Sequence, residues 1–245
     1  MQAFIGKVLT GQVNFSYKDY LKVYFSGCDF KCPICNTPEL LETKFEQEMD
    51  LRDVFKEMED QKENVEGVFV TGGEPLFQKQ ALLQLLQKVK ENELKAVIDT
   101  NGSKPEIFEK LLKDELLDII IMDLKAPFNQ LFEKVTKSAT WFKSSKDIRK
   151  DLEQTLEVLK AYDETVEVIF RTTIIPGVLF RKEELLEIAK SIKQIHSIWE
   201  LQPFRPGMIN DNKMKNINSP TNAFMNDLRE SIIKEYPQMD MRIIT

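Results

Sequence analysis

The chain is poor in the residues that mark several common classes of protein. It has three cysteines and one histidine in 245 residues, which excludes a disulfide framework and makes an ordinary four-ligand zinc site hard to assemble. No apolar run approaches the roughly 18 residues of a membrane-spanning helix. The start, MQAFIGKVLTGQ, also lacks the pattern of a signal peptide. We therefore expect a protein of the reducing cytoplasm that does not act on a membrane.

The chain also lacks an excess of basic residues. It has 34 Lys and Arg against 40 Asp and Glu, and a net charge of −6 gives no electrostatic reason to expect a nucleic-acid partner. Hydrophobic residues make up 42%, enough to fill the core of one large domain. We expect a single domain over 1–245, with its core over about 20–207 and a C-terminal loop and helix over 206–245.

The three cysteines lie within eight residues, as Cys28, Cys32 and Cys35 in a C-x3-C-x2-C pattern. They directly follow a strand-like run over 21–26, which indicates one metal site. Thiolates are soft ligands that suit zinc, copper or an iron–sulfur cluster. A cubic 4Fe–4S cluster usually takes four cysteines, so three would leave one iron free to bind another molecule. Chance clustering of buried cysteines is the alternative, and His196 is expected to be structural or exposed.

Apolar strand-like runs alternate with amphipathic helical patterns along the chain. Six such strand-then-helix units predict parallel strands joined by right-handed crossovers. Eight units would close a full barrel, so six suit an open, partial (βα)6 barrel; a doubly wound sheet is the alternative. The predicted core strands are 21–26, 67–71, 95–100, 117–124, 165–175 and 197–204. The predicted helices are 51–62, 79–92, one opened by a capping box at 103–106, 147–161, 182–194 and 219–234, with additional short strands at 4–8 and 241–244.

In either α/β fold, functional residues should lie at the C-terminal ends of the strands. The second strand runs into TGGEP at 71–75, where two glycines would let the backbone approach a ligand, although a plain turn would also explain them. The third and fourth strands end in DTNG at 99–102 and MDLK at 122–125. Their carboxylates would repel each other unless a cation or a lysine lies between them. The alternative is that Asp99 caps a turn and Asp123 pairs with Lys125.

The cysteine pattern after the first strand resembles the radical S-adenosylmethionine (SAM) superfamily. The resemblance covers about 20–207 and implies a partial barrel. It also implies a single 4Fe–4S cluster held by Cys28, Cys32 and Cys35. In that superfamily SAM binds the fourth iron, and an electron from the cluster splits SAM into methionine and a 5′-deoxyadenosyl radical. GGEP resembles the segment that binds the SAM amino group, with the Gly73 carbonyl as a candidate acceptor.

DTNG and MDLK resemble the activating enzymes of glycyl radical enzymes. In that family the matching positions surround SAM and a monovalent cation. The resemblance implies that Asp99, Thr100 and Asp123, with the backbone of Ile121, hold the cation. It places Lys125 near the SAM carboxylate. The implied cofactor-binding residues are Gly72, Gly73, Glu74, Asp99, Thr100, Asn101, Asp123, Lys125 and Arg171.

The activity implied by this resemblance is the formation of a glycyl radical on a partner enzyme, with a flavodoxin or a ferredoxin as the reductant. Arg205-Pro206-Gly207 and the residues 35–40 resemble the activators of anaerobic ribonucleotide reductase, whereas the pyruvate formate-lyase branch has a histidine where Arg205 stands. Two alternatives remain: a radical SAM enzyme for a small molecule, similar to 7-carboxy-7-deazaguanine synthase, and a non-enzymatic electron carrier. Trp141 and Phe142, in an irregular stretch, could either pack in the core or contact a partner.

Overall fold

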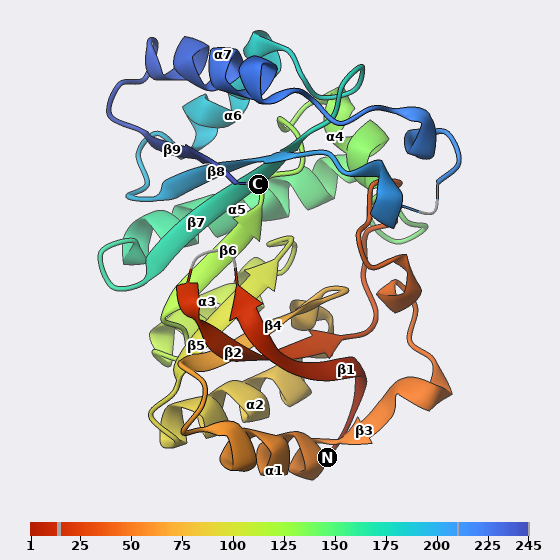
Figure 1. The fold of residues 1–245 in the computed structure, drawn as a ribbon, viewed down its shortest axis with the longest axis vertical. Helices are drawn as coiled ribbons and strands as arrows, with labels where there is room; N and C mark the ends of the chain where they lie inside the picture. Colours follow the sequence, from red (N-terminus) through yellow and green to blue (C-terminus); the bar gives the residue numbers. More distant parts are fainter. Residues whose placement is uncertain (14–15, 210, 245) are drawn as a thin grey trace.

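The computed structural model describes residues 1–13, 16–209 and 211–244, and within these ranges nine strands form one sheet (Figure 1). The strand order is β3-β1-β2-β4-β5-β6-β7-β8-β9. From β2 to β9 each strand runs parallel to its neighbour, whereas β1 is antiparallel to both β2 and β3. The bounds are β1 Gln2–Val13, β2 Ser16–Phe25, β3 Glu48–Asp50, β4 Gly67–Gly72, β5 Lys95–Thr100, β6 Ile119–Asp123, β7 Glu167–Ile174, β8 Ile198–Pro203 and β9 Asp240–Ile243.

The strand order decides between the two architectures that the sequence left open. A doubly wound sheet reverses its order at a switch point, but here the order follows the chain from β2 to β9 without reversal. The described sheet is curved, as Figure 1 shows. Its edge strands, β3 and β9, are not paired with each other, so the barrel is not closed. The α/β partial barrel is therefore confirmed, and the doubly wound alternative is wrong.

The helices lie along the outer side of the curved sheet, as Figure 1 shows. Each buries an apolar stripe; in α3 the stripe is Ile107, Phe108, Leu111 and Leu112. Alternate residues of a strand point to opposite faces, so Ile120 joins this outer core while Ile121 joins an inner cluster with Val97 and Ile169. The helices are α1 Leu51–Gln61, α2 Lys79–Glu91, α3 Pro105–Lys113, α4 Gln130–Thr136, α5 Ser145–Tyr162, α6 Lys182–Ile192 and α7 Asn222–Ile233. Short 3-10 turns occur at Pro38–Leu40, Phe45–Gln47, Pro75–Gln78, Pro206–Met208 and Met214–Asn216.

The N-terminal region differs most from the sequence prediction. The short strand predicted over 4–8 is part of β1, which pairs with β2 over most of its length. The predicted capping box over 103–106 is wrong. Lys104 stands at the N-cap of α3 without a side-chain cap, because the Ser103 hydroxyl donates instead to Asp29 at 2.6 Å. Pro105 does occupy the first turn, as its fixed φ favours.

The C-terminal part adds to the same sheet. β9, predicted as a terminal strand, pairs in parallel with β8. Helix α7 packs on both α6 and β9, and its buried residues are Met225, Leu228 and Ile232. Across the described ranges, no helix combines the length and the apolar character that crossing a membrane requires.

Candidate functional site

A cavity of about 170 Å³ opens at the C-terminal ends of the parallel strands, beside the loop that follows β2. Residues from β4, β5, β6, β7 and β8 contribute to its wall. It therefore gathers the strand-end motifs that the sequence singled out, as the rule for barrel enzymes predicts. The predicted site residues that line it are Cys28, Cys32, Cys35, Gly72, Gly73, Asp99, Thr100, Asn101, Asp123, Lys125 and Arg171.

The cysteine loop is held to the body of the protein by its backbone. The amide of Gly27 donates to the carbonyl of Leu40 at 2.8 Å, and the amide of Cys28 donates to that of Leu41 at 3.1 Å. All three thiols are free, with Cys32 buried and the other two partly buried. Burial raises the pKa of Cys32 to about 11 and raises that of Cys28 as well. Because burial favours the protonated thiols, a metal group that binds thiolates would have to offset the free energy of deprotonating them.

The three thiols suit the cluster that the sequence implies better than they suit a single metal ion. Among the residues that the structure describes, no three Cys, His, Asp or Glu side chains are arranged to hold one metal ion. The thiols nevertheless line one cavity and act electrostatically on one another, Cys28 with Cys32 and Cys32 with Cys35. A cluster binds each thiolate at a different iron, so it spans thiols that are too far apart for a single ion. Three thiols in one wall fit such a cluster.

The glycines of TGGEP are required by a close backbone approach. Gly72 has a φ of +113°, and a Cβ there would lie 2.4 Å from the carbonyl oxygen of Phe25. A Cβ on Gly73 would lie 2.4 Å from the carbonyl oxygen of Gly27. The amides of Gly73 and Glu74 donate to these same two carbonyls, each at 2.8 Å. The segment is thus pressed against the start of the cysteine loop, where no side chain would fit.

Glu74 differs from the expectation that it lies at the ligand. Its side chain is fully buried and is absent from the cavity wall. The carboxylate accepts from the amide of Asn101 at 2.7 Å, the hydroxyl of Thr100 at 2.7 Å and the amide of Leu76 at 3.0 Å. Burial, with the nearby charge of Asp29, raises its pKa to about 8, while these three donors oppose that rise. Glu74 therefore ties the end of β4 to the end of β5.

A second, partly buried network joins the cysteine loop to the end of β5. Asp29 accepts from the side-chain amide of Asn101 at 2.9 Å and pairs with Lys104 at 2.8 Å. Burial would raise the pKa of Asp29, but Lys104 and the hydrogen bonds from Ser103 and Asn101 hold it below its ordinary value. Sequence analysis missed Asp29 and Lys104, because nothing in a single sequence shows that two segments 75 residues apart meet.

Charged side chains fill the inside of the barrel next to the cavity. Asp123 forms an ion pair with Lys125, and Asp99 accepts from the Thr71 hydroxyl at 3.1 Å. Nη1 of Arg171 lies 3.8 Å from Asp99. Burial and the charge of Asp123 raise the pKa of Asp99 to about 6. The charge of Asp123 therefore disfavours that of Asp99, as their strand-end positions predicted.

Glu200 completes this cluster and was not predicted. Arg171 donates to one oxygen of Glu200 from Nε at 3.1 Å and from Nη2 at 2.9 Å. Glu200 is 4% exposed and lies two residues before Gln202, which lines the cavity. The period-two alternation of a strand therefore puts Glu200 on the inner face, and this was the one signal that could have found it.

The structure assigns different contacts to the residues of the predicted cation site. The Thr100 hydroxyl donates to Glu74 and accepts from the amide of Gly102 at 3.1 Å. It is therefore already engaged away from the two aspartates. The pairing of Asp123 with Lys125, weighed above as an alternative, is present.

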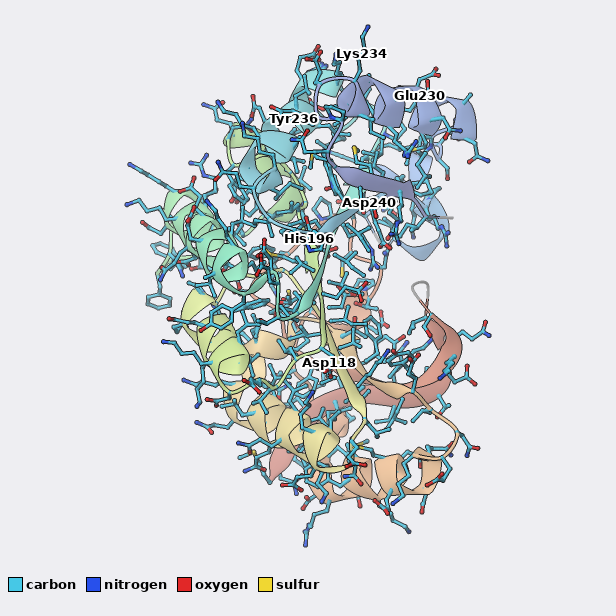
Figure 2. The ribbon with its side chains drawn as sticks, turned by 90° about the vertical axis from the view of Figure 1, so that its left-hand side faces the viewer. Asp118, His196, Glu230, Lys234, Tyr236 and Asp240 are labelled. Carbon is cyan, nitrogen blue, oxygen red and sulfur yellow. The ribbon has the colours of Figure 1, made fainter. Side chains whose placement is uncertain are left out.

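The single histidine lies at the other end of the strands. Figure 2 shows His196 with Asp118 and Asp240, which stand at the N-terminal ends of β6 and β9. A larger cavity, of about 760 Å³, opens there but contains none of the cysteines or strand-end motifs. His196 is exposed, and its backbone amide donates to Asp163 at 2.6 Å. The chemistry-bearing residues thus lie at the smaller cavity.

The family model described as "Radical SAM superfamily" matches residues 23–194. A protein of Methanocaldococcus jannaschii named "Putative glycyl-radical enzyme activating enzyme" is 30% identical over 94% of this chain and 92% of its own length. A pyruvate formate-lyase-activating enzyme of Clostridium pasteurianum is 25% identical over 80% of this chain and 79% of its length. The first of these matches spans nearly all of this chain.

Two further comparisons bear on the alternatives. A 7-carboxy-7-deazaguanine synthase of Methanopyrus kandleri is 30% identical, over 49% of this chain and 54% of its own length. A solved radical SAM methyltransferase of Sphaerobacter thermophilus superposes with a TM-score of 0.68 and 13% identity, over 98% of this chain and 77% of that one. At that identity the likeness concerns the fold alone.

Proposed function

The chain belongs to the radical SAM superfamily, and from this premise we propose that it is an activating enzyme that forms a glycyl radical on a partner enzyme. The observation that carries the proposal is the convergence of the cysteine loop, GGEP, DTNG and MDLK on one cavity. Relatives named as activating enzymes, matched over four fifths or more of the chain, support it.

We assign the cluster to Cys28, Cys32 and Cys35. When bound, a 4Fe–4S cluster and SAM supply the electron and the deoxyadenosyl group that remove a hydrogen atom from a glycine Cα. The protein's own residues bind and orient these groups and exclude water. Phe30, buried beside Cys28, shields the loop from solvent.

The remaining wall offers complementary groups for SAM. The backbone of Gly72 and Gly73 passes the cavity without side chains, so the Gly73 carbonyl can accept from an amino group. Lys125 and Arg171 supply positive charge for a carboxylate. A carboxylate that draws Lys125 toward itself would leave Asp123 and Asp99 facing each other. We infer that a monovalent cation then binds between them, with the backbone of Thr100 and Ile121 as further ligands.

We propose an anaerobic ribonucleotide reductase as the partner and a flavodoxin or a ferredoxin as the reductant, in a reducing cytoplasm. Arg205 supports this choice of partner, because the pyruvate formate-lyase branch has a histidine there. Arg205 is exposed directly after β8, where its fork of donors could hold a carbonyl or an acidic side chain of the partner. The open edge of the sheet supports access for a peptide loop.

The decisive experiment uses the anaerobically reconstituted protein, SAM, a reductant and a purified anaerobic ribonucleotide reductase. Electron paramagnetic resonance should show a glycyl doublet on the reductase, and 5′-deoxyadenosine and methionine should accumulate. A Gly→Ala change at the reductase's radical site should remove the doublet. Absence of the doublet while SAM is cleaved would contradict the proposed partner, and S-adenosylhomocysteine as the main product would contradict the activity.

A second candidate is a radical SAM enzyme that acts on a small molecule, favoured by the match to 7-carboxy-7-deazaguanine synthase. That match covers half of the chain, whereas the two activating-enzyme matches named above cover 94% and 80% of it. A small-molecule enzyme needs dedicated polar contacts in a closed pocket. Formation of 7-carboxy-7-deazaguanine by the reconstituted protein would establish this candidate instead.

A further inference from the structure

Two neighbouring aromatic residues are fully exposed on the connection between α4 and α5. Trp141 and Phe142 are each 100% exposed, so the option that they pack in the core is excluded. Single exposed apolar residues are ordinary, but two large adjacent rings without any cover are not. Tryptophan is also enriched among the residues that carry the binding energy of protein interfaces. These rings are therefore candidates for a protein contact.

The segment that carries these rings is basic, although the chain is acidic. Residues 131–150 contain six Lys or Arg and two Asp or Glu, in a chain of net charge −6. Exposed lysines flank the two rings in the sequence. Lys134 and Lys137 come before the rings, and Lys146 and Lys150 come after them. The last two are four residues apart in α5 and so lie on one helix face. An aromatic centre with basic surroundings complements an acidic protein surface.

This surface adjoins the cysteine loop through α4. The amide of Lys31, between the first two cysteines, donates to the carbonyl of Thr136 at 3.1 Å. Phe30 packs edge-on against Phe132 of α4, with ring centroids 5.9 Å apart, and both rings are buried. In Figure 1 the loop after β2 rises along the right-hand side toward α4. The exposed rings thus follow, five residues along the chain, the end of a helix that contacts the cysteine loop.

We propose that Trp141, Phe142 and the four exposed lysines form the docking surface of a small acidic one-electron carrier protein. We call these six residues the donor surface. The inference rests on the proposed function, because that chemistry needs an electron from outside the chain. One electron leaves the reduced carrier and enters the group held by the cysteines; the carrier is oxidised by one electron and no atom is transferred. The charge of the surface selects an acidic carrier, and α4 connects the surface to the cysteine loop.

Binding is measured first, on the protein without its cluster, by calorimetry with a purified acidic flavodoxin that carries FMN. Trp141→Ser/Phe142→Ser should weaken binding roughly 30-fold, as removal of interface anchors does. Lys146→Glu/Lys150→Glu should weaken it about tenfold and flatten its dependence on ionic strength. Because all four side chains are exposed, the fold should not change, which circular dichroism checks.

The matched charge control is Lys56→Glu/Lys79→Glu, which changes two exposed lysines on α1 and α2. Figure 1 shows these helices at the opposite end of the molecule from α4. The matched apolar control is Leu9→Ser, at a side chain that is 49% exposed on β1. Both controls should bind flavodoxin as the unaltered chain does. Equal losses in the controls, or no loss in the donor-surface variants, would overturn the proposal.

Turnover of the reconstituted protein separates docking from chemistry. With dithionite, a small reductant that needs no docking surface, all variants should cleave SAM at the same rate. With reduced flavodoxin, the donor-surface variants should be about tenfold slower at limiting flavodoxin. Equal slowing with both reductants would overturn the proposal, because the residues would then act on the site itself.

A failure of the proposed function can be distinguished from a failure of the docking proposal. If the unaltered protein cleaves no SAM with dithionite, the proposed function fails, while the binding experiment still decides whether the surface is real. The glycyl radical enzyme is the other possible occupant. If the variants lower the glycyl radical yield with dithionite while SAM cleavage is unchanged, the surface serves that enzyme and the donor proposal is overturned.

Discussion

Arg171 and Glu200 are register partners on the neighbouring strands β7 and β8, and their side chains meet inside the barrel. Nε and Nη2 of Arg171 both donate to one oxygen of Glu200, at 3.1 and 2.9 Å. The remaining nitrogen, Nη1, lies 3.8 Å from Asp99 at the cavity. Glu200 thereby fixes the plane of the guanidinium and leaves one donor directed toward the site. It is a positioning residue, since it acts through Arg171.

We expect Arg171→Lys and Glu200→Gln to weaken SAM binding by about tenfold each. A lysine has a single ammonium group, so it cannot hold Glu200 and face the cavity at the same time. A glutamine lacks the negative charge that orients the guanidinium of Arg171. Equilibrium dialysis of SAM against cluster-loaded protein provides the measurement, with Asp53→Asn, at an exposed position of α1, as the control. The double variant should lose little more SAM affinity than either single variant, because both changes break the same Arg171–Glu200 ion pair. Fully additive losses would show that Glu200 acts independently of Arg171.

Replacement of Cys28, Cys32 or Cys35 by Ala should abolish stable cluster binding. Each thiol is assigned to a different iron, and the chain has no fourth cysteine that could substitute. Iron and sulfide analysis after anaerobic reconstitution provides the measurement. Asn36→Ala, at an exposed position in the same loop, is the control and should keep a full complement. A single cysteine variant that retained all its iron and sulfide would refute the assignment.

Glu74→Ala should destabilise the fold rather than act on the ligand alone. It would leave the buried amides of Leu76 and Asn101 and the hydroxyl of Thr100 without their acceptor. Each buried unpaired donor costs about 1–3 kcal/mol, so we expect a loss of at least about 3 kcal/mol in the free energy of unfolding. Urea unfolding of the cluster-free protein measures it. Glu74→Gln, which keeps one acceptor oxygen, should lose less; equal stability of Glu74→Ala and the unaltered protein would contradict the role.

SAM cleavage should depend on potassium or sodium, and the dependence should grow as the pH falls. Cation binding needs charged carboxylates, and the pKa of Asp99 is raised to about 6 by burial and by Asp123. Between pH 7 and pH 5 protonation of Asp99 should therefore weaken the site, so more salt is needed. Asp123→Asn removes a ligand and should reduce cleavage at any salt concentration. Cleavage that is indifferent to exhaustive cation exchange and to Asp123→Asn would leave the Asp123–Lys125 pair as the full account of this region.

Several features were predictable because their signals are local. The apolar runs of β4 to β8 and the amphipathic stripe of α3 follow from periodicity, and the site motifs were found because barrel enzymes keep function at the C-terminal strand ends. The terminal strand β9 followed from the same patterns, whereas the first core strand, predicted over 21–26, is the end of the longer β2. Ser103 shows the limit of local reasoning: its sequence context indicated a capping box, but the half-buried Asp29 offered a better partner.

The sequence by itself determined the composition of the site: three thiols in one loop, glycines where backbones must touch, and carboxylates at adjacent strand ends. Only the tertiary structure decided how those groups are paired. Hydrogen bonds and ion pairs depend on which strand lies beside which, and on the side to which each residue faces. That is why Glu74 proved to be a buried tie between strand ends and Glu200 the partner of Arg171. It is also why the exposure of Trp141 could be settled by the fold and by nothing in the order of the residues.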